Sequence, residues 1–309
     1  MTKVVLVVAD SLRWDFASVE LFGQIFNEET WARVVTPNTY TAHCMPTLLL
    51  GDDMHGCSDF MRKITANSSL LHENDTVMWS DVFGGDKNVM QFGEEGEFDI
   101  RGFSDSTEYE FLQWLDQTDE LPELTIYHSM ITHWPFGVGD GGDSDVTFED
   151  GIFVDDKSKY KWNRDNYRLG VEAIRQRLQH IEKVTDDDTV VVLTSDHGEG
   201  LGERGSTGHI VDEDAEADWV HNQDQITEDK SWESNGNSIW KNEVPLVIGK
   251  DVELLEEYQL NQVRSIIASL LADGDLPSPH VYDTKAEVEF MGKQDRDVEE
   301  QLRNLGYKQ

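Results

Sequence analysis

The chain has 309 residues, of which 38% are hydrophobic and 10% aromatic, so it can bury a sizeable core and is not a disordered chain. It carries 62 Asp and Glu against 25 Lys and Arg, a formal net charge of −37 that argues against a nucleic-acid partner. Acidic residues spread along the whole chain are typical of adaptation to molar salt, where charges are screened beyond ~3 Å.

The sequence indicates no membrane span and no disulfide framework. The first apolar run, residues 4–9, is too short for a signal peptide or a transmembrane helix and meets Asp10 at once. The two cysteines, Cys44 and Cys57, form no metal-type CxxC pair. We therefore expect a soluble, cytoplasmic protein.

Short apolar runs alternate with helical patterns along the chain. Four β-branched or apolar runs predict strands buried on both faces: residues 4–9, 124–127, 190–193 and 244–248, the last with its regular part after Pro245. Apolar steps of three and four predict helices over 167–183 and 254–271, and shorter helices are expected over 47–50 and 295–305. Segments 138–159 and 211–238 have the composition of loops. This alternation favours a mainly parallel sheet with helices on both faces.

Two of these strands end in carboxylates. Asp10 follows the first strand, and Asp196 and His197 follow the strand over 190–193, with Gly198 permitting a turn. Because ligands in parallel sheets bind at the carboxyl ends of strands, these side chains are expected to share one edge. Carboxylate and imidazole are ordinary ligands of divalent transition metals, so the pattern favours a metal site.

Residues 36–56 combine a loop rich in nucleophiles with a helix that ends at Gly51. A nucleophile at a helix N-terminus benefits from the helix dipole and from free amide groups, which also bind anions. Thr41 and Cys44 are the two candidates. The alternative is a Thr-rich turn followed by a buried structural cysteine.

Several motifs follow one another in the order found in one enzyme family. They are Asp10, the segment from Thr41 to Gly51, His133-Trp134-Pro135-Phe136, Thr194 through Glu199 with His209, Val244-Pro245-Leu246, and Leu302 through Tyr307. In this order they resemble the sulfatase family of the alkaline phosphatase superfamily, over residues 4–249 and again at the last helix. The resemblance implies an alkaline-phosphatase-like α/β sandwich in which a metal-activated nucleophile cleaves or transfers sulfate or phosphate esters.

The resemblance also implies which residue is the nucleophile. In the family it stands ten residues before the glycine that ends the helix, which is Thr41 when counted from Gly51. Sulfatases proper oxidise the cysteine of a C-x-P-S-R motif to formylglycine, whereas this chain has Cys44-Met45-Pro46-Thr47-Leu48. The arginine is missing, and a threonine cannot give an aldehyde. We expect Thr41 to be the nucleophile, with Cys44 as the alternative.

Two further departures from the sulfatases concern the metal. Ser11 stands where they often have a second aspartate, and His197 where they commonly have asparagine. The set Asp10, Thr41, Asp196 and His197 is similar to that of the phosphoester and phosphotransferase branch, which often uses manganese or zinc. We expect Mn²⁺ or Zn²⁺ rather than Ca²⁺ or Mg²⁺, because an imidazole ligand suits Ca²⁺ poorly.

The remaining candidates concern the substrate. By the resemblance, His133 and His209 bind the transferred anion or protonate the leaving group. Arg13 either contacts substrate or forms a surface ion pair with Asp15. Four other histidines are expected to be structural or exposed: His43, His55, His128 and His221.

The predicted organisation is a catalytic core over 1–249 and a reduced C-terminal region over 250–309 that packs on it. The predicted function is metal-dependent hydrolysis of a sulfate or phosphate ester of a small molecule or glycan. One alternative is a phosphotransferase of the same superfamily. The other is a degenerate member that binds a glycan or another anion without turnover.

Overall fold

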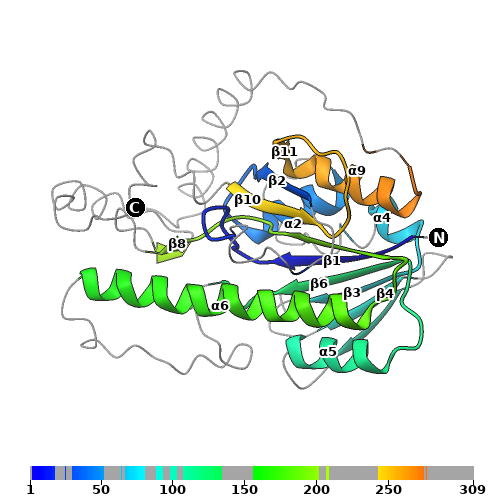
Figure 1. Ribbon diagram of the computed structural model, residues 1–309, viewed down its shortest axis with the longest axis horizontal. Helices are drawn as coiled ribbons and strands as arrows, with labels where there is room; N and C mark the ends of the chain where they lie inside the picture. The colour runs from blue at the N-terminus through cyan, green and yellow to red at the C-terminus, as the bar shows by residue number, and fades with distance from the viewer. Residues whose placement is uncertain are drawn as a thin grey trace, which may run out of the picture. The chain divides into compact units, whose positions relative to one another are not determined.

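The fold is built on a nine-stranded mixed sheet, seen among the strands of Figure 1. The computed structural model describes residues 2–17, 25, 30–51, 64, 67–80, 88–92, 98–102, 107–133, 156–201, 207–208, 243–274 and 276. Within them the strand order is β11-β2-β10-β7-β1-β6-β3-β4-β5. The strands are β1 (Lys3–Ala9), β2 (Thr30–Val35), β3 (Thr76–Ser80), β4 (Asn88–Phe92), β5 (Phe98–Gly102), β6 (Leu124–Ser129), β7 (Thr189–Thr194), β10 (Glu243–Ile248) and β11 (Glu257–Gln259). A separate two-stranded sheet joins β8 (Gly200–Leu201) to β9 (Thr207–Gly208).

The four central strands, β7, β1, β6 and β3, are all parallel, and each predicted strand is present. Antiparallel strands β10 and β4 flank them. The prediction that β10 begins after Pro245 was wrong, because the strand already includes Glu243. Pro245 is tolerated there because β10 pairs with β7 only from Leu246 onward. At Pro245 the edge of β10 that faces β7 therefore needs no backbone N–H donor.

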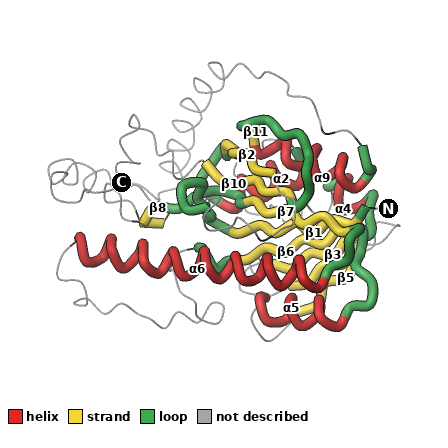
Figure 2. Tube along the Cα trace, viewed as in Figure 1, coloured by secondary structure: helices red, strands yellow, loops and turns green. Residues whose placement is uncertain are grey.

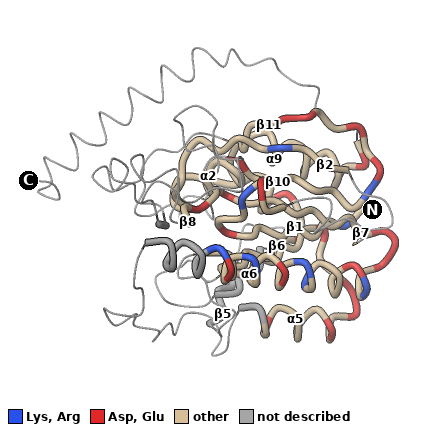
Figure 3. The backbone as a smooth tube through the Cα atoms, turned by 60° about the vertical axis from the view of Figure 1, so that its left-hand side comes forward, with Lys and Arg blue, Asp and Glu red and all other residues tan. Residues whose placement is uncertain are grey.

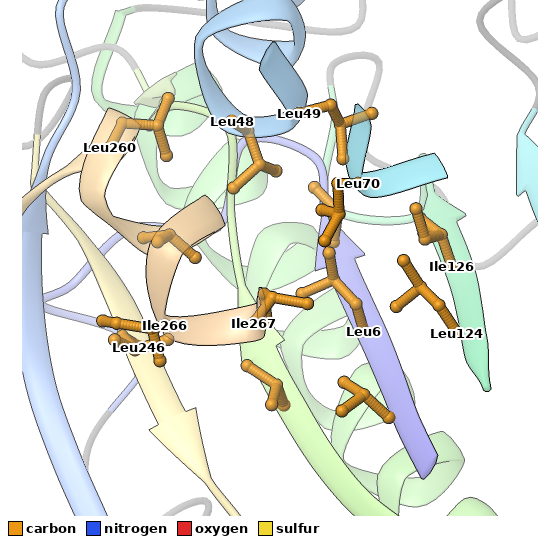
Figure 4. Close-up of a cluster of buried hydrophobic side chains, with 14 of the residues drawn as sticks. Leu6, Leu48, Leu49, Leu70, Leu124, Ile126, Leu246, Leu260, Ile266 and Ile267 are labelled. Atoms are coloured by element: carbon orange, nitrogen blue, oxygen red, sulfur yellow. The ribbon is translucent and has the colours of Figure 1, made fainter. Parts of the chain in front are cut away.

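Helices cover both faces of this sheet (Figure 2), which confirms the predicted α/β sandwich. Helices α2 (Thr41–Leu50), α4 (Ser69–His72) and α9 (Leu260–Leu271) lie on one face, and α5 (Thr107–Gln117) and α6 (Asp156–Val184) on the other. Strand β1 alternates between two cores: Leu6 packs with Leu48 and Ile267 (Figure 4), whereas Val5 and Val7 face α5 and α6. Such two-sided burial explains why its sequence is continuously apolar.

Three predicted helix boundaries differ from the structure. Helix α2 starts at Thr41 instead of residue 47, which places Thr41 in its first turn. Helix α6 starts at Asp156, inside the segment expected to be a loop. Residues 257–259, expected to be helical, form β11 beside β2, and a capping box between Gln259 and Gln262 starts α9 after it.

Gly170 allows α6 to pack closely against the chain after β6. A Cβ atom at Gly170 would lie 2.7 Å from the carbonyl oxygen of Ile131. Because no side chain larger than hydrogen fits there, α6 reaches the segment that leads from β6 to His133.

All described residues belong to one compact unit, Met1–Pro277. None of the helices described is both long and apolar enough to cross a membrane. The predictions for Cys57, for His55, for His209, for segment 211–238 and for the helix over 295–305 lie outside the described residues. The boundary between residues 249 and 250 stays a prediction.

Candidate metal centre

Three neighbouring parallel strands bring their functional residues to one edge of the sheet. Asp10 follows β1, Asp196 and His197 follow β7, and His128 lies near the end of β6, where it pairs with Val8. Asp10, His128 and Asp196 are at least 68 positions apart along the chain, but the strand order β7-β1-β6 makes them adjacent.

A strained turn holds Asp10 in place. Ser11 has a φ of 64°, a left-handed conformation that is costly for a residue with a side chain. Its N–H donates to Asp196 Oδ1 at 3.3 Å, and its carbonyl accepts a 2.6 Å hydrogen bond from the Tyr167 hydroxyl. The Arg13 N–H donates to the same hydroxyl oxygen at 2.8 Å. Helix α6 therefore fixes the turn that presents Asp10.

Thr41 contacts both strand ends. Its Oγ1 donates to Asp10 Oδ2 at 3.0 Å and lies 3.1 Å from His197 Nε2. His197 Nε2 in turn lies 3.3 Å from Asp196 Oδ2 and 3.7 Å from Asp10 Oδ1. The two aspartates and His197 are fully buried, and Thr41 is half-buried. The four predicted metal ligands thus lie together.

The donor atoms of this group fit a divalent cation. Asp196 Oδ2 is buried and accepts no hydrogen bond from any described residue, which is costly for a carboxylate oxygen without a cation. His197 Nδ1 lies 2.8 Å from the Gly198 carbonyl, which can only accept, so the neutral imidazole has its lone pair on Nε2, toward the carboxylates. Mixed oxygen and nitrogen donors around two buried carboxylates are a suitable transition-metal site.

His128 is a site residue that sequence reasoning missed. Its Nε2 lies 3.1 Å from Asp10 Oδ2, and its Nδ1 lies 2.9 Å from Ser80 Oγ. Potential ligand atoms of Asp10, His128 and Asp196 all lie within 4.8 Å of one another. Of the two expectations for His128, exposure was wrong, because the residue is fully buried. The sequence feature that could have identified His128 is its position at the end of an apolar strand, which is also the position of Asp10.

The buried carboxylates shift one another's pKa. Burial raises the pKa of Asp10, but the charge of His133 and the contacts of His128 and His197 outweigh it, leaving this pKa below its usual range. Burial, together with the charge of Asp10, raises the pKa of Asp196. Asp10 is thus easily kept ionised, whereas Asp196 resists ionisation. A bound cation would favour the ionised form of both carboxylates.

The two nucleophile candidates have different surroundings. Cys44 is a residue of α2 that is fully buried in the core, and its Sγ donates to the Asn38 carbonyl at 3.2 Å. Burial, with the nearby charge of Asp196, raises the pKa of its thiol well above the usual value, so it stays protonated and weakly nucleophilic. The geometry brings Thr41 to the cluster and leaves Cys44 in the core.

The other candidates are only partly placed. Arg13 is buried and forms a bidentate ion pair with Asp15, at 2.8 Å from Nε and 2.6 Å from Nη2. It also donates to the Glu199 carbonyl at 3.2 Å. The ion pair was one of its two predicted roles; the guanidinium of Arg13 is buried and Asp15 lies at the surface. His133 is half-buried and acts electrostatically on Asp10, and His209 lies outside the described residues.

No family model matches the chain. It is 24% identical, over 67% of its length, to a relative named low-salt glycan biosynthesis sulfotransferase Agl7, from Haloferax volcanii. The chain spans about half of that relative, 49% of its length. Sequence similarity therefore links it to a protein named as a group-transferring enzyme of glycan synthesis.

Solved structures match over most of the chain. The soluble domain of lipooligosaccharide phosphoethanolamine transferase A from Neisseria meningitidis has a TM-score of 0.54 and 17% identity, covering 87% of this chain and 88% of that one. The protein yidJ from Bacteroides fragilis, classed with the sulfatases, has a TM-score of 0.53 and 10% identity, covering 93% and 78%. The chain has the fold that sulfatases and phosphoethanolamine transferases of the alkaline phosphatase superfamily share, which confirms the predicted resemblance.

Proposed function

We propose that the protein is a metal-dependent enzyme that cleaves sulfate or phosphate esters through Thr41. The observation that carries this proposal is the contact of Thr41 Oγ1 with both Asp10 Oδ2 and His197 Nε2, beside an Asp196 oxygen that accepts no hydrogen bond from the described residues. Asp10, Thr41, Asp196 and His197 would hold the cation, with Mn²⁺ or Zn²⁺ favoured by the imidazole. When bound, the ion supplies Lewis-acid stabilisation of negative charge.

The chain's own residues account for the steps of the reaction. The Thr41 hydroxyl hydrogen points to Asp10, so a lone pair of Oγ1 remains for in-line attack on sulfur or phosphorus. The bond from Oγ1 forms as the bond to the leaving alcohol breaks. The proton of the Thr41 hydroxyl, made more acidic by a bound cation, passes to solvent water, and His133 or His209 donates the proton that the alcohol needs. Thr41 lies in the first turn of α2, where backbone amide groups favour an anion.

The acceptor in the second half of the reaction distinguishes two functions. Attack by water on the Thr41 ester gives a hydrolase, and attack by an alcohol gives a transferase. The name of the sulfotransferase relative and the phosphoethanolamine transferase fold favour the transferase as the second candidate. That relative's name also favours a glycan as the ester or the acceptor.

The test is turnover of nitrophenyl sulfate, nitrophenyl phosphate and the corresponding phosphodiester in molar KCl. Metal-stripped protein is supplied with Mn²⁺, Zn²⁺, Mg²⁺ or Ca²⁺, and wild type is compared with Thr41→Ala, Asp196→Asn and Cys44→Ala. We expect metal-dependent turnover that falls at least ~100-fold in the first two variants and less than about threefold in Cys44→Ala. If Cys44→Ala loses turnover and Thr41→Ala retains it, the nucleophile is Cys44 instead of Thr41.

Two further readouts separate the alternatives. With an added acceptor alcohol, a transferase releases more nitrophenol than free sulfate or phosphate, whereas a hydrolase releases equal amounts. Folded protein that turns over no ester with any ion, and that retains no metal after dialysis, would be a binding protein instead of an enzyme.

A further inference from the structure

Helix α6 begins with a concentration of positive charge that the rest of the chain lacks. Five of the twelve residues 157–168 are Lys or Arg and only Asp165 is acidic, in a chain with 25 basic and 62 acidic residues. Four of the five, at positions 157, 161, 164 and 168, follow helical spacing and fall on one face. We call Arg164 and Arg168, the two whose side chains the structure describes, the α6 basic face; Figure 3 shows Lys and Arg recurring along the described part of α6.

Helix stability does not explain these residues. Lys157, Lys159 and Lys161 fall in the first two turns of α6, where the helix dipole disfavours positive charge. A surface adapted to high salt through acidic residues does not explain them either. Since both local explanations favour acidic residues here, the basic face points to a partner with negative charge.

The basic face lies beside the metal centre. Tyr167, between Arg164 and Arg168, bonds to the turn that presents Asp10. Helix α6 also packs against β8, which closely follows Asp196 and His197 along the chain (Figure 1). Arg164 and Arg168 therefore lie next to the residue that holds the turn beside the metal centre.

Three guanidinium groups gather around one aromatic ring next to the turn. The Cζ atoms of Arg13, Arg164 and Arg168 lie 5.1, 5.5 and 5.9 Å from the ring centroid of Phe16. Arg13 is neutralised by Asp15, whereas Arg168 is exposed and forms no ion pair with any carboxylate of the described residues. Arg168 is thus placed to bind an added anion.

We infer that the substrate carries a second anionic group, besides the ester that is cleaved, and that this group binds at the α6 basic face. The inference rests on the proposed function and names its substrate class: a sulfate, phosphate or carboxylate substituent on the same molecule, such as a polyanionic oligosaccharide. A guanidinium matches the oxygens of such groups in bidentate geometry. The basic face would also offset the repulsion that a net charge of −37 imposes on a polyanion.

Isothermal titration calorimetry with disaccharide probes tests this. The probes share one sugar backbone and carry one sulfate, two sulfates, or one sulfate and one carboxylate. Wild type, Arg168→Gln and Arg177→Gln are titrated with Mn²⁺ in molar KCl. Arg177 is a matched control because it lies on α6 about two and a half turns further on and bonds to the Ala173 carbonyl.

We expect wild type to bind at least one doubly anionic probe about tenfold more tightly than the single sulfate. Arg168→Gln should lose about tenfold affinity for that probe and less than twofold for the single sulfate, with Arg177→Gln unchanged. The probe that is preferred identifies the second group as sulfate or carboxylate.

The inference would be overturned if wild type bound all probes with equal affinity, or if it bound none of them. A lower melting temperature of Arg168→Gln with unchanged probe selectivity would also overturn it, because acidic residues of the chain itself would then occupy the basic face. Aryl ester turnover, measured on the same samples, tells the two proposals apart. Turnover without probe selectivity refutes only the second anionic group of the substrate. Probe selectivity without turnover refutes only the proposal that the protein is an enzyme.

Discussion

At the scale of single residues, the site depends on side chains that are not among its predicted ligands or nucleophiles. Ser11 takes the left-handed conformation because its N–H and carbonyl are both bonded, to Asp196 and to Tyr167. The Ser11 hydroxyl lies 2.9 Å from Asp10 Oδ1 and 3.2 Å from Glu199 Oε2, both buried. A strained turn over-determined by its neighbours is the usual way in which a binding site is held rigid before the ligand arrives.

Tyr167→Phe tests this role. The ring keeps its edge contact with Phe16, at 4.8 Å between centroids, but the Ser11 carbonyl and the Arg13 N–H lose their partner. Leaving such buried groups unsatisfied costs about 1–3 kcal/mol, so the melting temperature should fall. We also expect Mn²⁺ affinity, measured by calorimetry, to fall severalfold as the turn relaxes.

The matched control for Tyr167 is Tyr258→Phe. Tyr258 is buried in β11, which β2 and β10 separate from β7, and its hydroxyl oxygen accepts from the Leu255 N–H at 3.0 Å. It should lower the melting temperature and leave Mn²⁺ affinity intact. Unchanged Mn²⁺ affinity in Tyr167→Phe would reduce Tyr167 to a packing residue.

At the scale of secondary-structure elements, the sequence predicts where strands lie along the chain better than it predicts which strands pair. Continuous β-branched runs predicted the strands that hold Asp10 and Asp196, because burial on both faces leaves a clear pattern. The role of His128 depends on β6 lying beside β1, a pairing that no local pattern encodes. The three residues of β11 are too few to show periodicity, and pairing with β2 overrides their helical spacing.

Because α6 lies so close to the chain after β6, we predict that a Gly→Ala substitution in this helix changes stability in the opposite direction to the usual one. Gly→Ala inside a helix ordinarily stabilises it, by about 0.5–1 kcal/mol. Gly170→Ala should instead destabilise the protein, because the new Cβ would lie 2.7 Å from the rigid Ile131 carbonyl. Urea unfolding measures the difference, with Leu169→Ala, an exposed neighbour in the same helix, expected to change stability by at most ~0.5 kcal/mol. A stabilised Gly170→Ala protein would show that α6 can move away from this segment.

At the scale of the whole molecule, the charge of −37 dominates the response to solvent. Screening reaches across ~10 Å at 0.1 M salt and only ~3 Å at 1 M. We therefore expect the melting temperature to rise steeply between 0.1 and 2 M KCl. Sucrose of equal osmolality is the control, because it stabilises by exclusion from the surface without screening charge. Equal stabilisation by sucrose and KCl would contradict a role for self-repulsion.

The strand order β7-β1-β6 also has a consequence for how the protein is made. During synthesis β1 emerges first, but its two neighbours are complete only after residues 129 and 194. Until then its apolar edges have no partner, and no shorter nascent chain contains both carboxylates of the metal centre. If Asp10, Asp196 and His197 hold a cation as proposed, its capture waits for residue 197, so metal uptake would report that the strands β7, β1 and β6 have assembled.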